Sequence, residues 1–130
     1  MTYRFEQLEI WQMARKFVNE IYSLTKIFPK EETFGLTIQI KRAALSIMLN
    51  ITEGSDRKSD IEFVRFLRIA YTSMEEVIAG LYIALDQNYI EQAEFEITYH
   101  NSNELGKKIN SLIKYLKNNQ AIAPTTGASR

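Results

Sequence analysis

The sequence predicts an all-α protein, built as an up-down-up-down antiparallel four-helix bundle. Apolar residues recur at helical spacing in four segments that are joined by short links. No alternating run of apolar and polar residues is bounded by turn residues, so no strand is predicted. The 130 residues contain two prolines and five glycines, which leaves few helix breakers. We expect one domain over residues 1–117 and a flexible tail over residues 118–130, where Ala, Thr, Gly and Pro are frequent.

The first helix is expected over about residues 8–28, with one apolar and one polar side. Trp11, Ala14, Val18 and Ile21 fall on the apolar side. Gln12, Lys16, Asn19 and Ser23 fall on the polar side. Pro29 disfavours a longer helix, because proline lacks the backbone N–H and its ring clashes with the preceding turn.

The second helix, expected within residues 31–54, is apolar on two faces. At about 100° per residue, one face carries Ile40, Ala44, Ile47 and Ile51. The opposite face, which should be polar on a surface helix, carries Ile38, Leu45, Met48 and Leu49. A helix that is apolar all round must be covered all round, so these four residues are predicted to face another copy of the chain. Gly54 suits a C-terminal cap of this helix.

The third and fourth helices are expected over about residues 59–86 and 91–116. Ser59 and Glu62 have the spacing of a capping box, which predicts a helix start at that point. The fourth helix has a clear apolar stripe only in its C-terminal half. Its N-terminal half carries Thr98, Asn101 and Ser102 where core residues are expected, so we predict looser packing there.

The charges balance over the whole chain but not along it. Sixteen basic and sixteen acidic residues give a formal net charge of zero, whereas a dedicated nucleic-acid binder is usually more basic. Between Ile69 and Gly106 there are seven acidic residues and no Lys or Arg. An up-down bundle would therefore have a basic and an acidic end. The candidate phosphate contacts near the basic end are Arg57, Lys58, Arg65, Arg68, Lys107 and Lys108. The alternative is that these are solvated charges, offset by the acids near them.

Few residues in the sequence favour catalysis. There is no cysteine, and His100 is the only histidine, so neither a thiolate zinc site nor a two-histidine site is expected. No phosphate-binding loop or dinucleotide-binding glycine motif occurs. We therefore expect no catalytic residue, no metal, no cofactor and no enzyme activity. The tyrosines at 71, 82, 89 and 99 could stack on bases, but tyrosines at helical spacing more often belong to a core or an interface.

The localisation expected from the sequence is cytoplasmic, without a membrane partner. The first residues, Met1 to Glu6, contain no apolar stretch of the signal-peptide type. The longest apolar-rich run, Ile78 to Leu85, is far too short to span a bilayer.

Several short motifs resemble those of a known bacterial family. They are Leu8-Glu9-Ile10-Trp11-Gln12, Phe28-Pro29-Lys30-Glu31-Glu32, Gln39-Ile40, Arg42-Ala43-Ala44, Glu53-Gly54 and Glu62-Phe63. They are similar to the four-helix bundle family first known from intervening sequences inside 23S ribosomal RNA genes, some members of which carry the label of a ribosomal protein. The chain departs from the family pattern at Met48 and Leu49, where proline and serine are common.

The resemblance implies a four-helix bundle that assembles into a ring-shaped homo-oligomer, most often a pentamer. The family is also similar to accessory proteins of diversity-generating retroelements, which bind nucleic acid and a reverse transcriptase through basic surfaces. Two hypotheses follow. The first is a non-enzymatic oligomeric bundle that binds RNA or DNA through phosphate contacts. The second is a protein-interaction scaffold that binds no nucleic acid.

Overall fold

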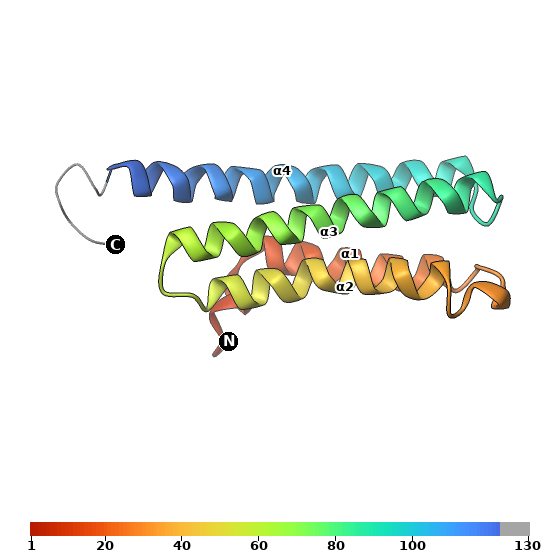
Figure 1. The fold of residues 1–130 in the computed structure, drawn as a ribbon, viewed down its shortest axis with the longest axis horizontal. Helices are drawn as coiled ribbons and strands as arrows, with labels where there is room; N and C mark the ends of the chain where they lie inside the picture. The colour runs from red at the N-terminus through yellow and green to blue at the C-terminus, as the bar shows by residue number, and fades with distance from the viewer. Residues whose placement is uncertain (123–130) are drawn as a thin grey trace.

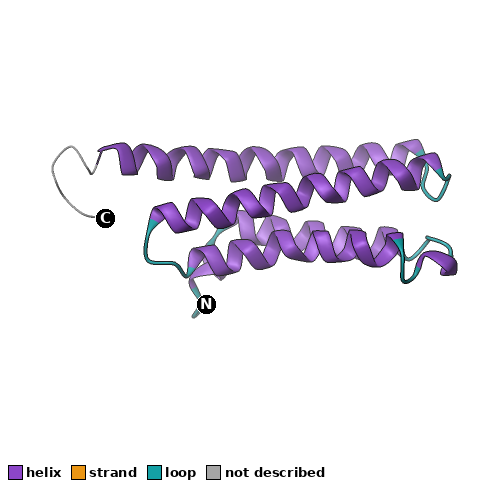
Figure 2. Cartoon of the chain, in the orientation of Figure 1, coloured by secondary structure: helices purple, strands orange, loops and turns teal. Residues whose placement is uncertain are grey.

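The computed structural model describes residues 1–122, which form four long helices and two short 3₁₀ helices (Figure 2). The long helices are α1 (Glu9–Thr25), α2 (Leu36–Ser55), α3 (Asp60–Asp86) and α4 (Gln92–Ile122). The 3₁₀ helices are η1 (Arg4–Gln7) and η2 (Lys30–Glu32). No strand occurs within the described residues, which confirms the all-α class. Figure 1 shows the four helices side by side, with successive links at alternate ends of the molecule.

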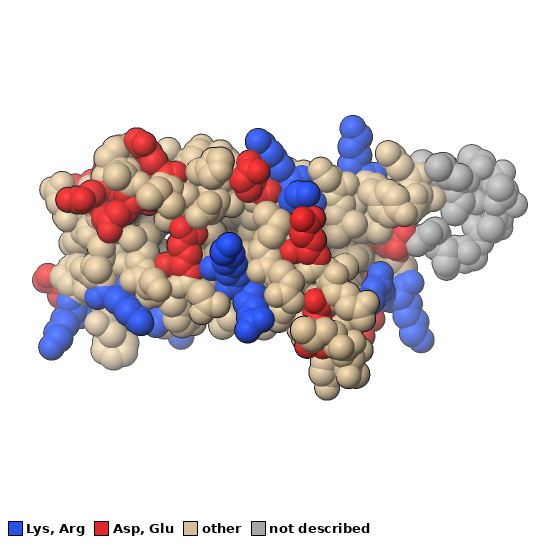
Figure 3. Space-filling view, turned by 180° about the vertical axis from the view of Figure 1, so that it is seen from behind, with Lys and Arg blue, Asp and Glu red and all other residues tan. Residues whose placement is uncertain are grey.

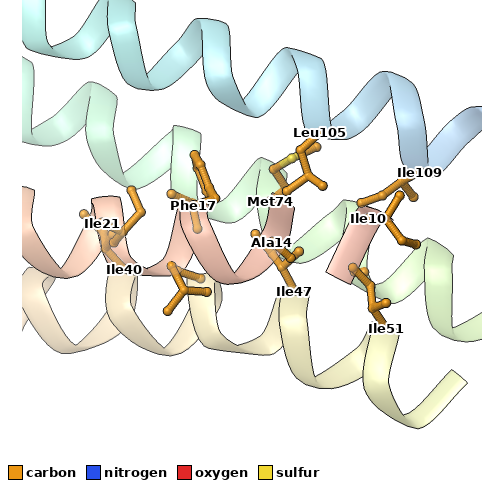
Figure 4. Packing of buried hydrophobic residues seen from close by; sticks show 14 of the residues in the cluster. Ile10, Ala14, Phe17, Ile21, Ile40, Ile47, Ile51, Met74, Leu105 and Ile109 are labelled. Carbon is orange, nitrogen blue, oxygen red and sulfur yellow. The ribbon is translucent and has the colours of Figure 1, made fainter. Parts of the chain in front are cut away.

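One hydrophobic core runs along the molecule between the helices. Each long helix contributes a stripe of buried side chains at helical spacing, some of which are labelled in Figure 4. The largest fully buried residues include Ile21, Ile40, Ile47, Ile51, Leu67, Leu81, Leu105 and Ile109. The predicted inner face of the second helix is thereby confirmed.

The end of α2 differs from the prediction for Gly54. The helix continues to Ser55, so Gly54 lies inside it and is not a C-terminal cap. A Cβ at Gly54 would lie 2.7 Å from the Cβ of Phe66 and 3.0 Å from the Cδ1 of Phe63. Glycine is therefore needed here because it lets α2 approach α3 closely.

Helix α4 also extends further than predicted. It reaches Ile122, whereas the spacing of apolar residues predicts an end near Leu116. The first residues of the predicted flexible tail are therefore helical, and residues 123–130 of that tail lie outside the described part of the chain.

The N-terminal half of α4 is well packed at two of the three polar positions on which the prediction of looser packing rested, whereas Asn101 is exposed. Thr98 is 2% exposed and Ser102 is 3% exposed, so the prediction is wrong for these residues. The Ser102 hydroxyl donates a hydrogen bond to the backbone oxygen of Tyr99 at 2.8 Å. A buried hydroxyl that is satisfied within its own helix costs little, which explains why serine is tolerated in the core.

Helix capping and one side-chain contact hold the links in place. Ser59 accepts a hydrogen bond from the Glu62 backbone N–H at 3.2 Å, as predicted for the start of α3. At the other end of the molecule, the Tyr89 hydroxyl donates to Glu32 at 2.9 Å, and Glu32 also accepts from the Leu36 backbone N–H at 3.0 Å. The bonds from Leu36 and Tyr89 lower the pKa of Glu32, and the bond to Glu32 raises the pKa of Tyr89.

Candidate interaction surfaces

An arginine cluster lies where α2 turns into α3. The guanidinium carbons of Arg57 and Arg65 lie 4.8 and 5.1 Å from the centre of the Phe66 ring. Each arginine also forms an ion pair, Arg57 with Glu53 at 2.7 Å and Arg65 with Glu62 at 3.0 Å. One aromatic ring thus brings together two of the predicted phosphate contacts, which come from different elements.

The ion pairs of this cluster are exposed to solvent. The side chains of Arg57 and Arg65 are 42% and 61% exposed. The hydrogen bond from Arg65 lowers the pKa of Glu62, and the same bond raises the pKa of Arg65. Exposed ion pairs of this kind contribute only about 0–1 kcal/mol to the stability of the folded protein. Both guanidinium groups are therefore able to exchange a carboxylate for a phosphate.

The other four predicted contacts do not all join this cluster. Lys58 and Arg68 are exposed, and neither has an acidic partner within the described residues. Lys107 pairs with Glu104 of its own helix at 3.4 Å. Lys108 lies 3.3 Å from Glu9 of α1 and so lies on the α1 side of α4, away from Phe66. The six residues therefore do not form a single surface.

The predicted separation of charge between the two ends is present only along α3 and α4. Figure 3 shows acidic side chains gathered at the end where α3 turns into α4. The link between α1 and α2 brings Lys26 and Lys30 to the same end of the molecule, so that end is not uniformly acidic.

The predicted contact face of α2 divides into two parts. Met48 packs against the core of its own chain. Leu49 is 50% exposed, and Ile38 and Leu45 are partly buried. On the adjacent helix α3, Ile69 and Ile83 are also exposed. Ile69 points away from α4, since it lies about half a turn from the α4-facing Tyr71, whereas Ile83 lies about 100° from the α4-facing Tyr82.

A chain of polar contacts crosses from α2 to α3 beside this apolar face. The Asn50 side-chain amide donates to the backbone oxygen of Ser46 at 2.8 Å and to the Ser46 hydroxyl at 3.0 Å. The hydroxyls of Ser46 and Ser73 lie 2.8 Å apart and share a hydrogen bond. Asn50 is a polar residue on an otherwise apolar helix, and its side-chain N–H groups therefore find acceptors within the chain.

Two further features bear on the class of protein. Among the described residues, no group of three or more histidine, aspartate or glutamate side chains is placed to hold a metal ion. No helix within residues 1–122 combines the length and apolar character needed to cross a membrane.

The fold and surfaces define a class: an all-α protein of four long helices, with an exposed apolar face and separate charged clusters. More specifically, the chain belongs to the 23S rRNA-intervening sequence protein family, whose model matches residues 6–111. It is similar to a crystal structure, at 1.70 Å resolution, of a protein of unknown function from the S23 ribosomal protein family of Bacteroides thetaiotaomicron.

That crystal structure shares 27% sequence identity with the chain at a TM-score of 0.75. The match covers 81% of this chain and 98% of the other. No curated protein matches the chain. The family resemblance read from the sequence motifs is thereby confirmed.

Proposed function

We propose that the protein is a non-enzymatic, oligomeric helical bundle that binds RNA or DNA through phosphate contacts. The observation that carries the proposal is the pair of guanidinium groups, from Arg57 and Arg65, over the single ring of Phe66. Paired guanidinium groups match the geometry of phosphate oxygens, and such contacts need no base readout. The family is described by its association with 23S rRNA intervening sequences, which supports RNA as the first ligand to test.

The remaining basic residues extend this contact. Lys58 follows Arg57 in the turn, and Arg68 lies one helical turn beyond Arg65, so both are near the arginine pair. Neither Lys58 nor Arg68 forms an ion pair with a carboxylate within the described residues. Lys107 and Lys108 on α4 form a second proposed contact, which a longer nucleic-acid strand would reach.

The proposed assembly is a ring of up-down-up-down bundles, with five copies as the family resemblance implies. Its interface contains Ile38, Leu45 and Leu49 of α2, with Met48 at the edge. A cyclic assembly would present several copies of the arginine cluster to one nucleic acid, so that individually weak contacts add to a useful affinity.

Nucleic-acid binding is tested with mixed-sequence RNA and the full chain, followed by fluorescence anisotropy over a salt series. We expect the affinity to fall steeply between about 50 and 200 mM salt, because phosphate contacts release counterions. Replacing both arginines with glutamine (R57Q/R65Q) should weaken binding and reduce the log–log salt slope by about 2, that is, about 1 per lost phosphate contact.

The matched control removes two positive charges at the other end of the molecule (K26Q/K30Q). It should leave the affinity close to that of the wild type. The proposal is wrong if the wild-type protein binds no RNA at low salt, or if the control variant weakens binding as much as R57Q/R65Q does.

A second candidate function is a scaffold for another protein, without nucleic acid. The observation that favours it is the charge balance at the turn. Four acids, Glu53, Asp56, Asp60 and Glu62, accompany the four bases there, Arg57, Lys58, Arg65 and Arg68. A pull-down with and without nuclease separates the two functions. A protein partner that is retained after nuclease treatment favours the scaffold, and a partner that is lost favours nucleic-acid binding.

A further inference from the structure

A groove lined by tyrosines lies between α3 and α4. Tyr71 and Tyr82 of α3 and Tyr99 of α4 line a hollow of about 380 Å³, together with Met74 and Ile78. An adjoining hollow of about 320 Å³ is lined by Tyr82, Phe95, Glu96, Tyr99, His100 and Asn103. The two hollows share Tyr82, Tyr99 and Asn103, so they adjoin on the same α3–α4 face, and we refer to them together as the tyrosine groove.

The rings of this groove are held in place by packing. The ring of Phe95 lies 4.7 Å from that of Tyr82 and 5.7 Å from that of Tyr99, measured between centroids. A Cβ at Gly106 would lie 2.8 Å from Met74 and 3.2 Å from the ring of Tyr71, so the glycine makes room for the floor of the groove. The groove is therefore preformed by side chains that already pack against one another.

The groove remains open to solvent. Tyr82 is 48% exposed and Tyr99 is 38% exposed. No hydrogen bond within the described residues engages the hydroxyl of Tyr71, Tyr82 or Tyr99. The tyrosines thus offer the exposed part of their rings, as well as their hydroxyl groups, to a ligand.

The charged side chains that line the groove are acidic. Glu75 and Glu96 line it, and neither forms an ion pair within residues 1–122. The chain has no Lys or Arg from Ile69 to Gly106. Carboxylates repel phosphate, which argues against base stacking on these tyrosines. A cation is attracted both by the carboxylates and by the electron-rich faces of the rings.

We propose that this groove docks a basic segment of a partner protein, with an arginine or lysine side chain placed over the ring of Tyr82 or Tyr99. Glu75 and Glu96 pair with the positive charges of that segment. The groove thereby differs from the arginine cluster in both position and charge. The protein has one surface for phosphate and another for a basic polypeptide.

The test uses the full chain and a fluorescein-labelled peptide of repeated Arg-Ala-Leu, with repeated Glu-Ala-Leu as the peptide control. We expect only the arginine peptide to bind. Removing the two ring faces while keeping apolar side chains (Y82L/Y99L) should weaken binding about ten-fold, in line with cation–π contacts. The same variant should bind mixed-sequence RNA like the wild type, so failure of this proposal is distinguishable from failure of the nucleic-acid proposal.

Two adjacent glutamates provide a matched pair of charge variants. Glu75 lines the tyrosine groove, whereas Glu76 lines a separate hollow between α2 and α3. Replacing Glu75 with glutamine should weaken peptide binding about three-fold, the size expected of one exposed ion pair, and Glu76→Gln should leave it unchanged. This comparison does not depend on the folding of the tyrosine variant.

Three outcomes would overturn the proposal. The first is absence of binding between the arginine peptide and the wild-type chain. The second is equal weakening by Glu75→Gln and Glu76→Gln, which would mean attraction by overall charge alone. The third is a change in the sedimentation of Y82L/Y99L without peptide, which would identify the groove as a contact between copies of the chain.

Discussion

The α2–α3 pair and the α1–α4 pair are packed in different ways. Between α2 and α3, glycines allow a close approach, since a Cβ at Gly54 or at Gly80 would lie 2.7 Å from the nearest side-chain atom of the other helix. Between α1 and α4 there is a hollow of about 390 Å³. Polar groups bridge this gap, with Asn101 donating to Glu20 at 2.9 Å and Lys108 lying 3.3 Å from Glu9.

The outer surface of α1 also differs from that of the α2–α3 pair. The outer face of α1 is polar apart from Tyr22, which is 37% exposed, and its polar side chains are Gln12, Arg15, Lys16, Asn19 and Ser23, all exposed. The outer face of α2 and α3 exposes Leu49, Ile69 and Ile83. Helix α4 also exposes Ile97 and Tyr115, each 61%, but the α2–α3 pair combines the close approach with apolar side chains on its outside. This is the pattern expected of a helix pair that is covered on both sides, whereas the α1 face needs only solvent.

The largest effect on stability is expected at Gly54, where the close approach can be broken by one methyl group. The new Cβ would press on the Cβ of Phe66, which cannot move without the backbone of α3. Gly54→Ala should lower the free energy of unfolding by about 1–3 kcal/mol, which outweighs the gain in helix propensity. Urea denaturation checks this. The exposed control Ser111→Ala on α4 should change stability by less than about 0.5 kcal/mol.

A smaller effect is expected from the hydrogen bond between Ser46 and Ser73. Ser73→Ala should cost about 1 kcal/mol, since it removes a contact between two helices. A double-mutant cycle of Ser46→Ala with Ser73→Ala should show coupling, whereas Ser46→Ala with Ser102→Ala should be additive. Ser102 is a matched control because it is equally buried and bonds only within α4. Additivity in both cycles would mean that the contact does not stabilise the α2–α3 pair.

The smallest effect is expected at Glu20, on the α1–α4 side. Burial raises the pKa of this carboxyl, and hydrogen bonds from Asn101 and Thr98 and the charge of Lys16 only partly offset the rise. The native state therefore holds the proton more tightly than the unfolded chain, and this contribution to stability is lost as the pH rises through the folded pKa.

Glu20→Gln removes the charge and keeps an oxygen that accepts from Asn101. The variant should be more stable than the wild type at neutral pH by about 0.5 kcal/mol or less. The difference should shrink as the pH falls toward 4.5, the ordinary pKa of a glutamate, because the native carboxyl takes up its proton above that pH. Thermal unfolding at several pH values measures it, and a variant less stable than the wild type at neutral pH would contradict the explanation.

The sequence predicted the four helices and their inner faces because apolar spacing alone determines them. Gly54 was misread because a glycine near a helix end suits a cap as well as a close helix contact, and only the position of Phe66 distinguishes the two. The sequence also predicted the position of Lys108 along the axis of the bundle, but not which neighbouring helix it faces. Which neighbour a helix face meets depends on the direction in which the bundle turns, and the hydrophobic pattern does not specify that direction.

Sedimentation velocity of three proteins tests most directly whether the α2 face contacts another copy. They are the wild type, the α2 variant L45E/L49E and the α1 variant Q12E/N19E, with helical content checked by circular dichroism. We predict that the wild type and the α1 variant sediment as an assembly, and that the α2 variant sediments as a single chain or loses its fold. A wild-type protein that sediments as a single chain, or an α2 variant that sediments with the wild-type assembly, would contradict the proposed interface.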